Sequence, residues 1–372
     1  MAKVAGRRRR VPALRVAALA VALTGALVGS LTGCGTVPPP GAVQDSAGDR
    51  VPLGELTPLA DPRSHTGPST ALVEQADVEP VRRGTEPELP ATVTDDQGTS
   101  VTVTDASRIL ALDVSGTLAA TVFGLGLGDR VVGRDTSTGF PAARRLPLVT
   151  VNGHQLNAEG IVGLRPTVVL TDTTLGPWDV ILQLRDMGVP VVVVTHKRGM
   201  DTNATIVRSV ARALGVPGAG DELAARMAAE VERTTAAIAR LAPAEPERKL
   251  RVVFLYLRGT AGVYYLFGRG SGADSLITAL GAVDVATEVG LEGMRPINPE
   301  ALARAKPDVI LLMTKGLESV GGVEGALTVP GIAQTPAGQR RRFVDMSDYQ
   351  ILGFGPLTSA VLDGLARALY AP

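Results

Sequence analysis

One stretch of this chain, from Gly218 to Leu241, constrains the fold more than any other because its periodicity predicts a single long helix. Apolar residues fall on one face of this helix and charged residues lie elsewhere, so one side is expected to be buried. The apolar stripe consists of Leu223, Met227, Val231, Ile238 and Leu241. At about 1.5 Å per residue the helix spans about 35 Å, the width of a small domain. Because α/β-type sequence lies on both sides, the helix is either a spine between two lobes or a long ordinary core helix.

The length and composition of the chain restrict its function. With 372 residues, 45% of them hydrophobic, the chain can build two cores. Its 37 basic residues balance 37 acidic residues, so the charge does not indicate a nucleic-acid-binding protein. Its single cysteine excludes disulfides and cysteine-ligated zinc or iron–sulfur sites in the mature chain.

Residues 1–33 have the pattern of a lipoprotein signal peptide. Arg7 to Arg10 and Arg15 precede the apolar run from Val16 to Leu31, which is short for a membrane span. The sequence Leu31-Thr32-Gly33-Cys34 resembles a bacterial lipobox. This resemblance implies that Cys34 is lipid-modified, begins the mature chain and anchors it on the extracytoplasmic face of the cell membrane. The arginines do not decide between the Sec and twin-arginine export routes.

Residues 34–90 are rich in Pro, Gly, Ser, Thr and Asp and show no sustained period. Such a segment buries too little apolar surface to offset its ordering entropy. We therefore expect a disordered tether between the lipid and the folded part. His65 lies inside this segment, where we expect no ligand role.

The folded part is expected to begin with a hairpin, because Ala91–Thr94 and Ser100–Thr104 alternate about a glycine turn. Strand and helix patterns then alternate, which predicts an α/β lobe with a parallel sheet. Strands are expected at 108–112, 131–133, 148–151, 168–170 and 191–195, and helices at 116–125 and 178–187. In such a lobe, binding residues occupy loops beyond the carboxyl ends of the strands.

Two histidines occupy loops of this kind. His154 follows the third expected strand and precedes a helix that starts near Asn157, so it is expected at the edge of the sheet. His196 follows the last strand, but neighbouring Lys197 and Arg198 disfavour a bound cation. His154 is therefore the better ligand candidate, and a solvated loop histidine without function is the alternative.

The chain contains an internal repeat with a constant offset of 141 residues. The repeated segments are 156–171 and 297–312. They share Asn, Glu, Pro, Val and Leu at equivalent positions, which predicts a helix followed by a strand in each half. Asn157 and Asn298 are expected to cap these helices, while Glu159 and Glu300 lie in the first turns, where the helix dipole favours a carboxylate. Helix capping alone therefore explains both glutamates.

The second half contains a strand pattern that ends in two polar side chains. In the strand expected at 249–258, alternation places Tyr256 and Arg258 on one face, and Gly259 ends the strand directly after them. Both side chains are therefore expected to emerge at the carboxyl edge of the sheet, opposite the region of His154.

A glycine-rich turn at 268–272 precedes a helix expected at 273–280. A turn of this kind at a helix N-terminus can hold an anion. It lacks the Gly-Lys-Ser/Thr ending of a phosphate loop, so we interpret it as a structural turn.

Taken together, these features resemble the substrate-binding proteins of bacterial importers for iron-siderophores, haem and cobalamin. The resemblance rests on the lipobox, the leading hairpin, two α/β lobes around a spine helix and the paired Asn-x-Glu…Pro-x-Val units, and it covers residues 91–372. It implies an α/β class III periplasmic-binding-protein fold, in which two Rossmann-like lobes are joined by a long spine helix. The implied parts are an N-terminal lobe (91–197), connecting helices including the spine (198–245) and a C-terminal lobe (246–372). The resemblance also implies a monomer that docks on an ABC permease with its ATPase, through Glu159 and Glu300 bound to permease arginines.

Three features resemble the haem-binding lipoproteins within this family. They are the Tyr256-Leu257-Arg258 triplet, the loop residue His154 and the segment Leu352-Gly353-Phe354-Gly355-Pro356. The resemblance implies that His154 and Tyr256 are the axial ligands of a haem (hemin) iron, since imidazole and phenolate both ligate haem. A ferric ion together with the Arg258 guanidinium favours the phenolate form of the tyrosine.

The resemblance also predicts residues that line the pocket, and two other functions have to be compared with haem binding. Met294 and Tyr349, in loops near the expected cleft, are expected to line the haem pocket beside Arg258. A ferric-siderophore or cobalamin binder is the alternative, with the same fold and an aromatic, basic cleft but no iron ligation by Tyr256. An enzyme is not indicated, because the sequence contains no Gly-x-Ser-x-Gly, no His-Glu-x-x-His and no plausible triad around its three histidines.

Overall fold

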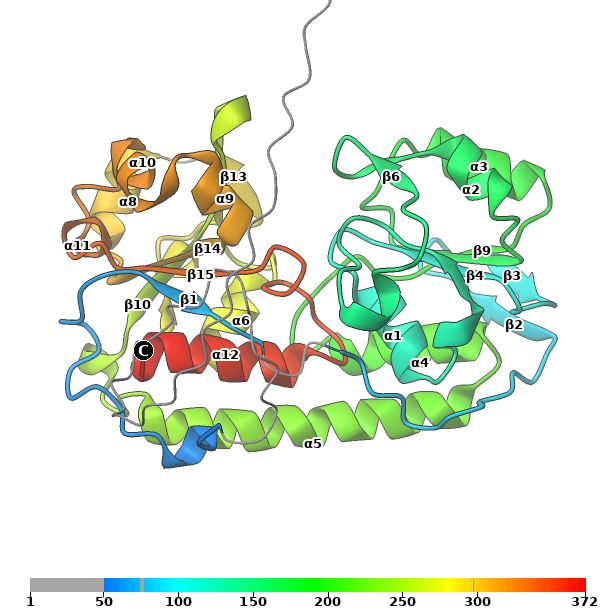
Figure 1. Ribbon diagram of the computed structural model, residues 1–372, viewed down its shortest axis with the longest axis horizontal. Helices are drawn as coiled ribbons and strands as arrows, with labels where there is room; N and C mark the ends of the chain where they lie inside the picture. The colour runs from blue at the N-terminus through cyan, green and yellow to red at the C-terminus, as the bar shows by residue number, and fades with distance from the viewer. Residues whose placement is uncertain (1–49, 74–76, 297) are drawn as a thin grey trace, which may run out of the picture. The chain divides into compact units, whose positions relative to one another are not determined.

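The computed structural model describes residues 50–73, 77–296 and 298–372, which form two α/β lobes joined by helix α5 (Pro217–Leu241). Figure 1 shows α5 running along one side of both lobes. The predicted signal peptide and Cys34 lie outside the described residues. Within the described ranges, no helix combines the length and apolar character needed to cross a membrane.

The N-terminal lobe is built on a four-stranded parallel sheet in the order β5-β4-β8-β9. Its strands are β4 (Ile109–Leu112), β5 (Val131–Gly133), β8 (Val168–Thr171) and β9 (Val191–Val193). Two antiparallel pairs accompany this sheet: β2 (Ala91–Thr94) with β3 (Ser100–Val103), and β6 (Thr150–Val151) with β7 (Gln155–Leu156). The helices are α1 (Thr117–Gly124), α2 (Ala158–Gly163), α3 (Asp179–Asp186) and α4 (Asn203–Ala213), with short 3-10 turns η2 (Gly128–Arg130) and η3 (Pro141–Ala143). The leading hairpin and the parallel sheet confirm the predicted α/β architecture.

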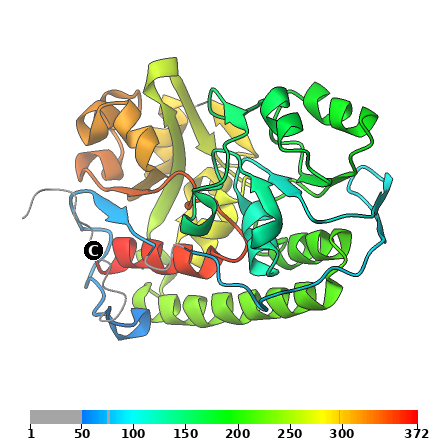
Figure 2. The same cartoon turned by 45° about the vertical axis from the view of Figure 1, so that its right-hand side comes forward.

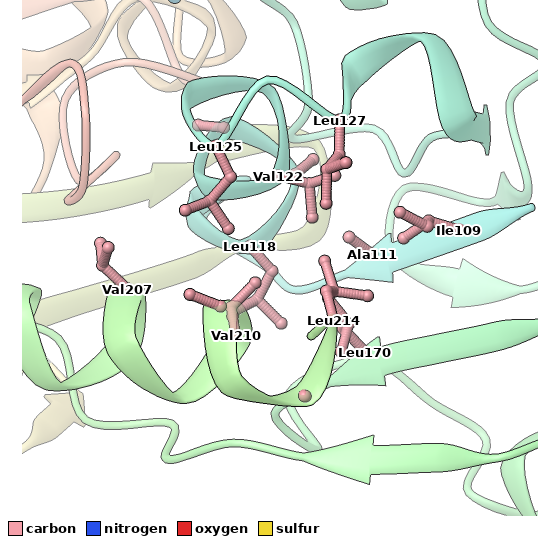
Figure 3. Packing of buried hydrophobic residues seen from close by; sticks show 14 of the residues in the cluster. Ile109, Ala111, Leu118, Val122, Leu125, Leu127, Leu170, Val207, Val210 and Leu214 are labelled. Atoms are coloured by element: carbon pink, nitrogen blue, oxygen red, sulfur yellow. The ribbon is translucent and has the colours of Figure 1, made fainter. Parts of the chain in front are cut away.

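Helices cover both faces of this sheet, and every residue of β4 and β8 is buried as a result. Figure 3 shows one of these interfaces, where Leu118 of α1 and Val210 of α4 pack near Ile109 of β4. Helix α4 lies in the segment that was predicted to hold connecting helices. Its buried side chains belong to the core of the N-terminal lobe.

The C-terminal lobe is built on a mixed sheet in the order β1-β15-β14-β10-β11-β13, with β12 beside β10. Strands β1, β15, β14 and β10 are parallel, while β11 and β13 add antiparallel strands at one edge. The strands are β1 (Ser69–Ala71), β10 (Arg251–Arg258), β11 (Val263–Phe267), β12 (Val283–Asp284), β13 (Met294–Pro296), β14 (Val309–Met313) and β15 (Phe343–Met346). The helices are α6 (Ala273–Ala279), α7 (Val285–Glu288), α8 (Pro299–Ala305), α9 (Thr314–Ser319), α10 (Gly322–Thr328), α11 (Pro336–Gln339) and α12 (Thr358–Tyr370). Short 3-10 turns are η1 (Leu53–Glu55), η4 (Pro246–Arg248) and η5 (Gly259–Ala261).

Helix α5 contributes side chains to the cores of both lobes. Leu223 and Met227, near its start, belong to the core of the N-terminal lobe. Ile238 and Leu241, near its end, belong to a core of the C-terminal lobe. The predicted apolar stripe is therefore confirmed, and the helix is a spine and not a core helix of one lobe. The absence of a side chain at Gly220 lets α5 approach α4 closely, since an added Cβ would lie 2.3 Å from that of Ala211.

The expectation of a disordered tether over residues 34–90 is wrong for its ordered part. Strand β1 pairs in parallel with β15 and extends the sheet of the C-terminal lobe. Leu53 and Ala71 are buried in the core of that lobe. The composition of this segment did not predict a strand. The segment is ordered because β1 pairs with the edge of β15, which lies more than 270 residues later in the chain. Residues 34–49 lie outside the described residues.

The internal repeat corresponds to equivalent helix–strand units in the two lobes. Helix α2 leads to β8, which pairs with β4, and α8 leads to β14, which pairs with β10. The start of the neighbouring strand repeats as well. Arg108 donates to the carbonyl of Leu164 at the end of α2 (2.6 Å), and Arg251 donates to the carbonyl of Ala305 at the end of α8 (2.8 Å). These guanidinium groups satisfy helix C-terminal carbonyls in both copies.

Charged side chains meet in the interior at the carboxyl ends of the strands of the N-terminal sheet. Asp113 follows β4, Asp135 follows β5 and Asp172 follows β8. Arg198 donates to Asp113 (3.1 Å) and to Asp172 (2.5 Å). Asp135 accepts the backbone N–H groups of Asp113 (3.1 Å) and Thr138 (2.8 Å). Burial, followed by the charge of Asp113, raises the pKa of Asp135 to about 7, and the same two causes raise the pKa of Asp172.

The raised pKa of Asp135 predicts a pH-dependent stability. In the unfolded chain this carboxyl group titrates near 3.8, so between that pH and about 7 the folded state binds the additional proton. Its contribution to the free energy of unfolding is complete at acid pH and is lost as the pH rises through about 7. We expect the midpoint of thermal unfolding to fall by a few degrees from about pH 5 to about pH 8.

Replacing Asp135 isolates this contribution. Asp135→Asn carries no titratable group at this position. The difference between its unfolding midpoints at about pH 5 and about pH 8 should therefore be smaller than in the wild type, even if the variant is less stable at both pH values. Asp129→Asn, at an exposed position of η2, should leave the difference unchanged. A pH dependence that is the same in wild type and Asp135→Asn would contradict the prediction.

Candidate functional site

Tyr256 occupies the end of β10 in the C-terminal lobe. It lies opposite Tyr265 of the antiparallel neighbour β11 and is half-buried. Its ring stacks on that of Phe267, with centroids 6.1 Å apart and an angle of 23° between the planes. A strand and an aromatic neighbour therefore hold the phenol in a defined direction.

Arg258 lies on the same face of β10 as Tyr256, as the strand alternation predicted. Its Nε donates a hydrogen bond to Tyr256 Oη (2.9 Å), and its guanidinium carbon lies 4.9 Å from the centroid of the ring. Strand β10 ends at Arg258, and Gly259 begins the turn η5, which confirms the predicted end of the strand. A guanidinium group that donates to a phenol oxygen stabilises the phenolate, the form that binds ferric iron.

Asp348 completes this arrangement and was missed by the sequence analysis. Both terminal nitrogens of Arg258 donate to Asp348 Oδ1 at 3.4 Å, and the backbone N–H of Lys315 donates to Asp348 Oδ2 at 2.9 Å. Asp348 lies two residues beyond β15, at the same sheet edge as the end of β10. A carboxylate just past a parallel strand is the signal that could have found it.

His154 lies in the turn between β6 and β7, so the loop expected after a single strand is the tip of a small hairpin. Asn152 and Gly153 make this turn with positive φ angles of 49° and 91°. The hydroxyl of Thr136 donates to the Gly153 carbonyl (2.7 Å) and lies 2.8 Å from that of Thr150, which ties the hairpin to the loop after β5.

His154 keeps contact with solvent, and its imidazole lies within electrostatic range of Arg258 in the C-terminal lobe. Partial burial, followed by the positive charge of Arg258, lowers its pKa, although Arg258 belongs to the other lobe. Figure 1 shows the β6–β7 hairpin on the side of its lobe that faces the C-terminal lobe. His154 and the Tyr256–Arg258 pair therefore lie on facing sides of the two lobes, and we call these three residues with Asp348 the inter-lobe site.

Met294 and Tyr349, both predicted to line the pocket, differ in their surroundings. Met294 begins β13 instead of lying in a loop, and its side chain is 60% exposed. Tyr349 makes a contact between the lobes, because its hydroxyl accepts a hydrogen bond from Arg144 Nη2 (3.0 Å) and its ring covers Gly139. The pocket role of each residue stays a prediction.

The other candidates from the sequence lie apart from the inter-lobe site. His196 is exposed after β9, while neighbouring Arg198 is buried in its ion pairs with Asp113 and Asp172. Partial burial and the charge of Arg342 lower the pKa of His65, which precedes β1.

Glu159 and Glu300 are exposed in the first turns of α2 and α8. The side chain of Asn157 caps α2 by accepting the N–H of Gly160 (3.2 Å), and that of Asn298 caps α8 by accepting the N–H of Ala301 (3.0 Å). The predicted caps are therefore asparagines, and the two glutamate carboxylates remain available to solvent. In Figures 1 and 2, α2 and α8 lie on the side of the two lobes away from α5.

In the glycine-rich turn before α6, a side-chain carboxylate of the helix occupies the position where an anion could bind. The carboxylate of Asp274 accepts the backbone N–H groups of Gly270 (2.9 Å) and Gly272 (3.1 Å). This geometry supports the interpretation of a structural turn. A cavity of about 720 Å³ lies nearby, lined by residues that include Met200, Val231 and Thr278, and the inter-lobe site does not contribute to it.

A family model described as "Periplasmic binding protein" matches residues 113–349. The chain belongs to this family. The match begins at Asp113, directly after β4, and ends at Tyr349, so it includes His154, Tyr256 and Arg258.

Solved structures of related binding proteins resemble this chain over most of its length. The crystal structure of the heme binding protein HmuT is 43% identical with a TM-score of 0.80, and the match covers 84% of this chain and 100% of that one. The periplasmic heme-binding protein RhuT from Roseiflexus sp. RS-1, in its apo form, is 38% identical with a TM-score of 0.64, covering 72% and 98%.

A relative in Bacillus subtilis (strain 168) is YvrC, described as an uncharacterized ABC transporter substrate-binding lipoprotein. It is 22% identical over 285 residues, which are 76% of this chain and 86% of that protein. The family match and the two structures confirm the predicted fold of two α/β lobes around a spine helix.

Proposed function

We propose that this protein is an extracytoplasmic haem-binding protein that captures ferric haem (hemin) at the inter-lobe site and delivers it to an ABC permease with its ATPase. The observation that carries the proposal is the Tyr256 phenol at the end of β10, held by the Arg258 guanidinium and facing His154 of the other lobe. The protein would act by binding and release, as a monomer, with no reaction on the ligand.

The chemistry of the pair suits haem. A porphyrin supplies four nitrogen ligands to its iron, so the protein needs only the two axial ligands, and phenolate and imidazole both serve in this role. The hydrogen bond from Arg258 directs the Tyr256 oxygen and places a positive charge beside it, which would offset the negative charge of an iron-bound phenolate. The lowered pKa of His154 favours the neutral imidazole, which is the form that binds a metal.

The surroundings also suit a flat, mostly apolar ligand. Val151, beside the His154 turn, is 43% exposed, and Met294 of the C-terminal lobe is 60% exposed. Exposed apolar side chains near polar anchors are typical of a ligand surface. We assign to Met294 a role in the wall of the pocket and to Tyr349 a role at its edge.

The related proteins support the same cargo, because the solved structures at 43% and 38% identity are both named as heme-binding proteins. A ferric siderophore or cobalamin would suit the same fold. Neither of these ligands uses the combination of a phenol, its guanidinium partner and a facing imidazole as an axial pair, so we favour haem.

Titration with hemin, followed by absorption spectroscopy, tests this proposal. The wild type should give a Soret band and the bands of phenolate-ligated ferric haem. Tyr256→Phe removes only the ligating oxygen and should weaken binding by about tenfold or more. His154→Ala should weaken binding less, because a strand and Arg258 hold the tyrosine whereas a hairpin tip holds the histidine.

Tyr264→Phe is the matched control, since Tyr264 lies one residue from Tyr265 on β11 and packs in the other core of the lobe. It should bind hemin like the wild type. If wild-type protein leaves the spectrum of free hemin unchanged, the haem assignment is wrong, and binding of a ferric siderophore or cobalamin becomes the favoured hypothesis.

We further propose that Glu159 and Glu300 bind arginines of the permease. Both are exposed, at equivalent positions of the two lobes and on the side away from α5. Glu159→Ala combined with Glu300→Ala should abolish haem uptake in cells and leave hemin affinity within about twofold, because exposed charges contribute little to the lobes.

The control for this double variant replaces two exposed glutamates at the opposite side, Glu232→Ala on α5 with Glu245→Ala just after it. Uptake should persist in the control. Normal uptake by the Glu159/Glu300 variant would show that other residues contact the permease.

The lipid anchor at Cys34 is the third part of the proposal. Cys34→Ala should move the protein from the membrane fraction to the soluble exported fraction. Hemin affinity should stay the same, because the folded part begins after this residue. A loss of hemin binding in the released protein would contradict the separation of anchor and binding site.

A further inference from the structure

We propose that Asp348 is a positioning residue of the inter-lobe site, which orients Arg258 toward Tyr256, and that the adjacent Tyr349 makes this orientation depend on the opposite lobe. The inference rests on the haem-binding function proposed above and adds a residue that acts through another.

Asp348 connects the first turn of α9 to Arg258. Its Oδ2 accepts the backbone N–H of Lys315 in the first turn of α9 (2.9 Å). Its Oδ1 accepts from both terminal nitrogens of Arg258, each at 3.4 Å. The side chains of Arg258 and Asp348 are only 31% and 20% exposed, so solvent screens this pair less than it screens a surface ion pair.

The division of donors on Arg258 explains why this contact matters for Tyr256. The terminal nitrogens of the guanidinium point to Asp348, which leaves Nε to donate to the phenol oxygen at 2.9 Å. The guanidinium is a rigid fork on a flexible stem, so one fixed acceptor sets the direction of the remaining donors. Without Asp348 the fork is free to turn, and a haem carboxylate would compete for it.

Tyr349 links this arrangement to the N-terminal lobe. Its hydroxyl accepts from Arg144 Nη2 (3.0 Å), whose Nε donates to the Gly139 carbonyl (3.0 Å). A Cβ added at Gly139 would lie 2.6 Å from the Tyr349 ring, so the ring sits directly on the glycine backbone. Two consecutive residues thus contact the two lobes, Asp348 its own and Tyr349 the other. A displacement of Tyr349 would therefore shift the acceptor that aims Arg258.

A double-mutant cycle on Asp348 and Arg258 tests the positioning role. Hemin affinity and the phenolate-to-iron charge-transfer band are measured for wild type, Asp348→Ala, Arg258→Ala and the double variant, each with a thermal unfolding curve. Asp348→Ala should weaken hemin binding by about tenfold and reduce the band. In the Arg258→Ala background, the same change should alter affinity by less than about twofold, because Asp348 acts through Arg258.

Three further variants complete the test. Asp348→Asn keeps an oxygen that can accept from Arg258 and should restore part of the band. Glu318→Gln, an exposed residue of α9 in the same lobe, should leave both readouts unchanged. Gly139→Ala, in the opposite lobe, should displace Tyr349 and reduce the band in wild type but not in Arg258→Ala.

The outcomes separate this inference from the proposed function. Wild-type protein without a phenolate band would overturn both. A normal wild-type band with an unchanged Asp348→Ala band, or with effects of Asp348→Ala and Arg258→Ala that multiply, would overturn only the positioning role. An unchanged band in Gly139→Ala would overturn the link to the opposite lobe.

Discussion

The arrangement of this molecule depends on one helix that is shared by two hydrophobic cores. The early turns of α5 bury Leu223 and Met227 in the N-terminal lobe, and its last turns bury Ile238 and Leu241 in the C-terminal lobe. A helix of 25 residues is a nearly rigid rod, so these contacts fix the spacing of two sheets that share no strand. The inter-lobe site takes His154 from one lobe and Tyr256, Arg258 and Asp348 from the other, so its geometry depends on this spacing.

The two sides of the inter-lobe site are supported in different ways. Tyr256 lies on a strand that pairs with β11 and β14, and its phenol is fixed by Arg258, which is fixed in turn by Asp348. His154 lies at the tip of a hairpin of two-residue strands, which is joined to its surroundings by the hydroxyl of Thr136 and by the backbone bridge between Gln155 and Gly176. On the tyrosine side these contacts hold the phenol itself, whereas on the histidine side they hold the backbone of the hairpin.

The loop after β5 connects the buried charges of the N-terminal lobe to this site. Asp135 points into the interior, where it accepts the N–H of Asp113. Thr136 reaches the hairpin that carries His154, and Gly139 supports the ring of Tyr349 from the other lobe. One short loop thus contacts a buried ionisable cluster, the His154 side of the inter-lobe site and the junction between the lobes. The hydrogen bonds from Arg198 to Asp113 and Asp172 hold the base of this cluster together.

Local patterns determined which residues share a face, whereas long-range packing decided which residues meet. The stripe on α5, the asparagine caps of α2 and α8, and the common face of Tyr256 and Arg258 follow from helix and strand geometry, so the sequence by itself predicted them. The pairing of β1 with β15 joins residues more than 270 positions apart, and no local periodicity in the Pro- and Gly-rich segment predicts this pairing. Likewise Asp348 meets Arg258 from 90 residues away, and Tyr349 meets Arg144 from 205 residues away. The first two contacts require the folded C-terminal lobe, and the last requires both lobes. Residues so far apart in the sequence meet only when the folded backbone brings them together, so no local pattern predicts them.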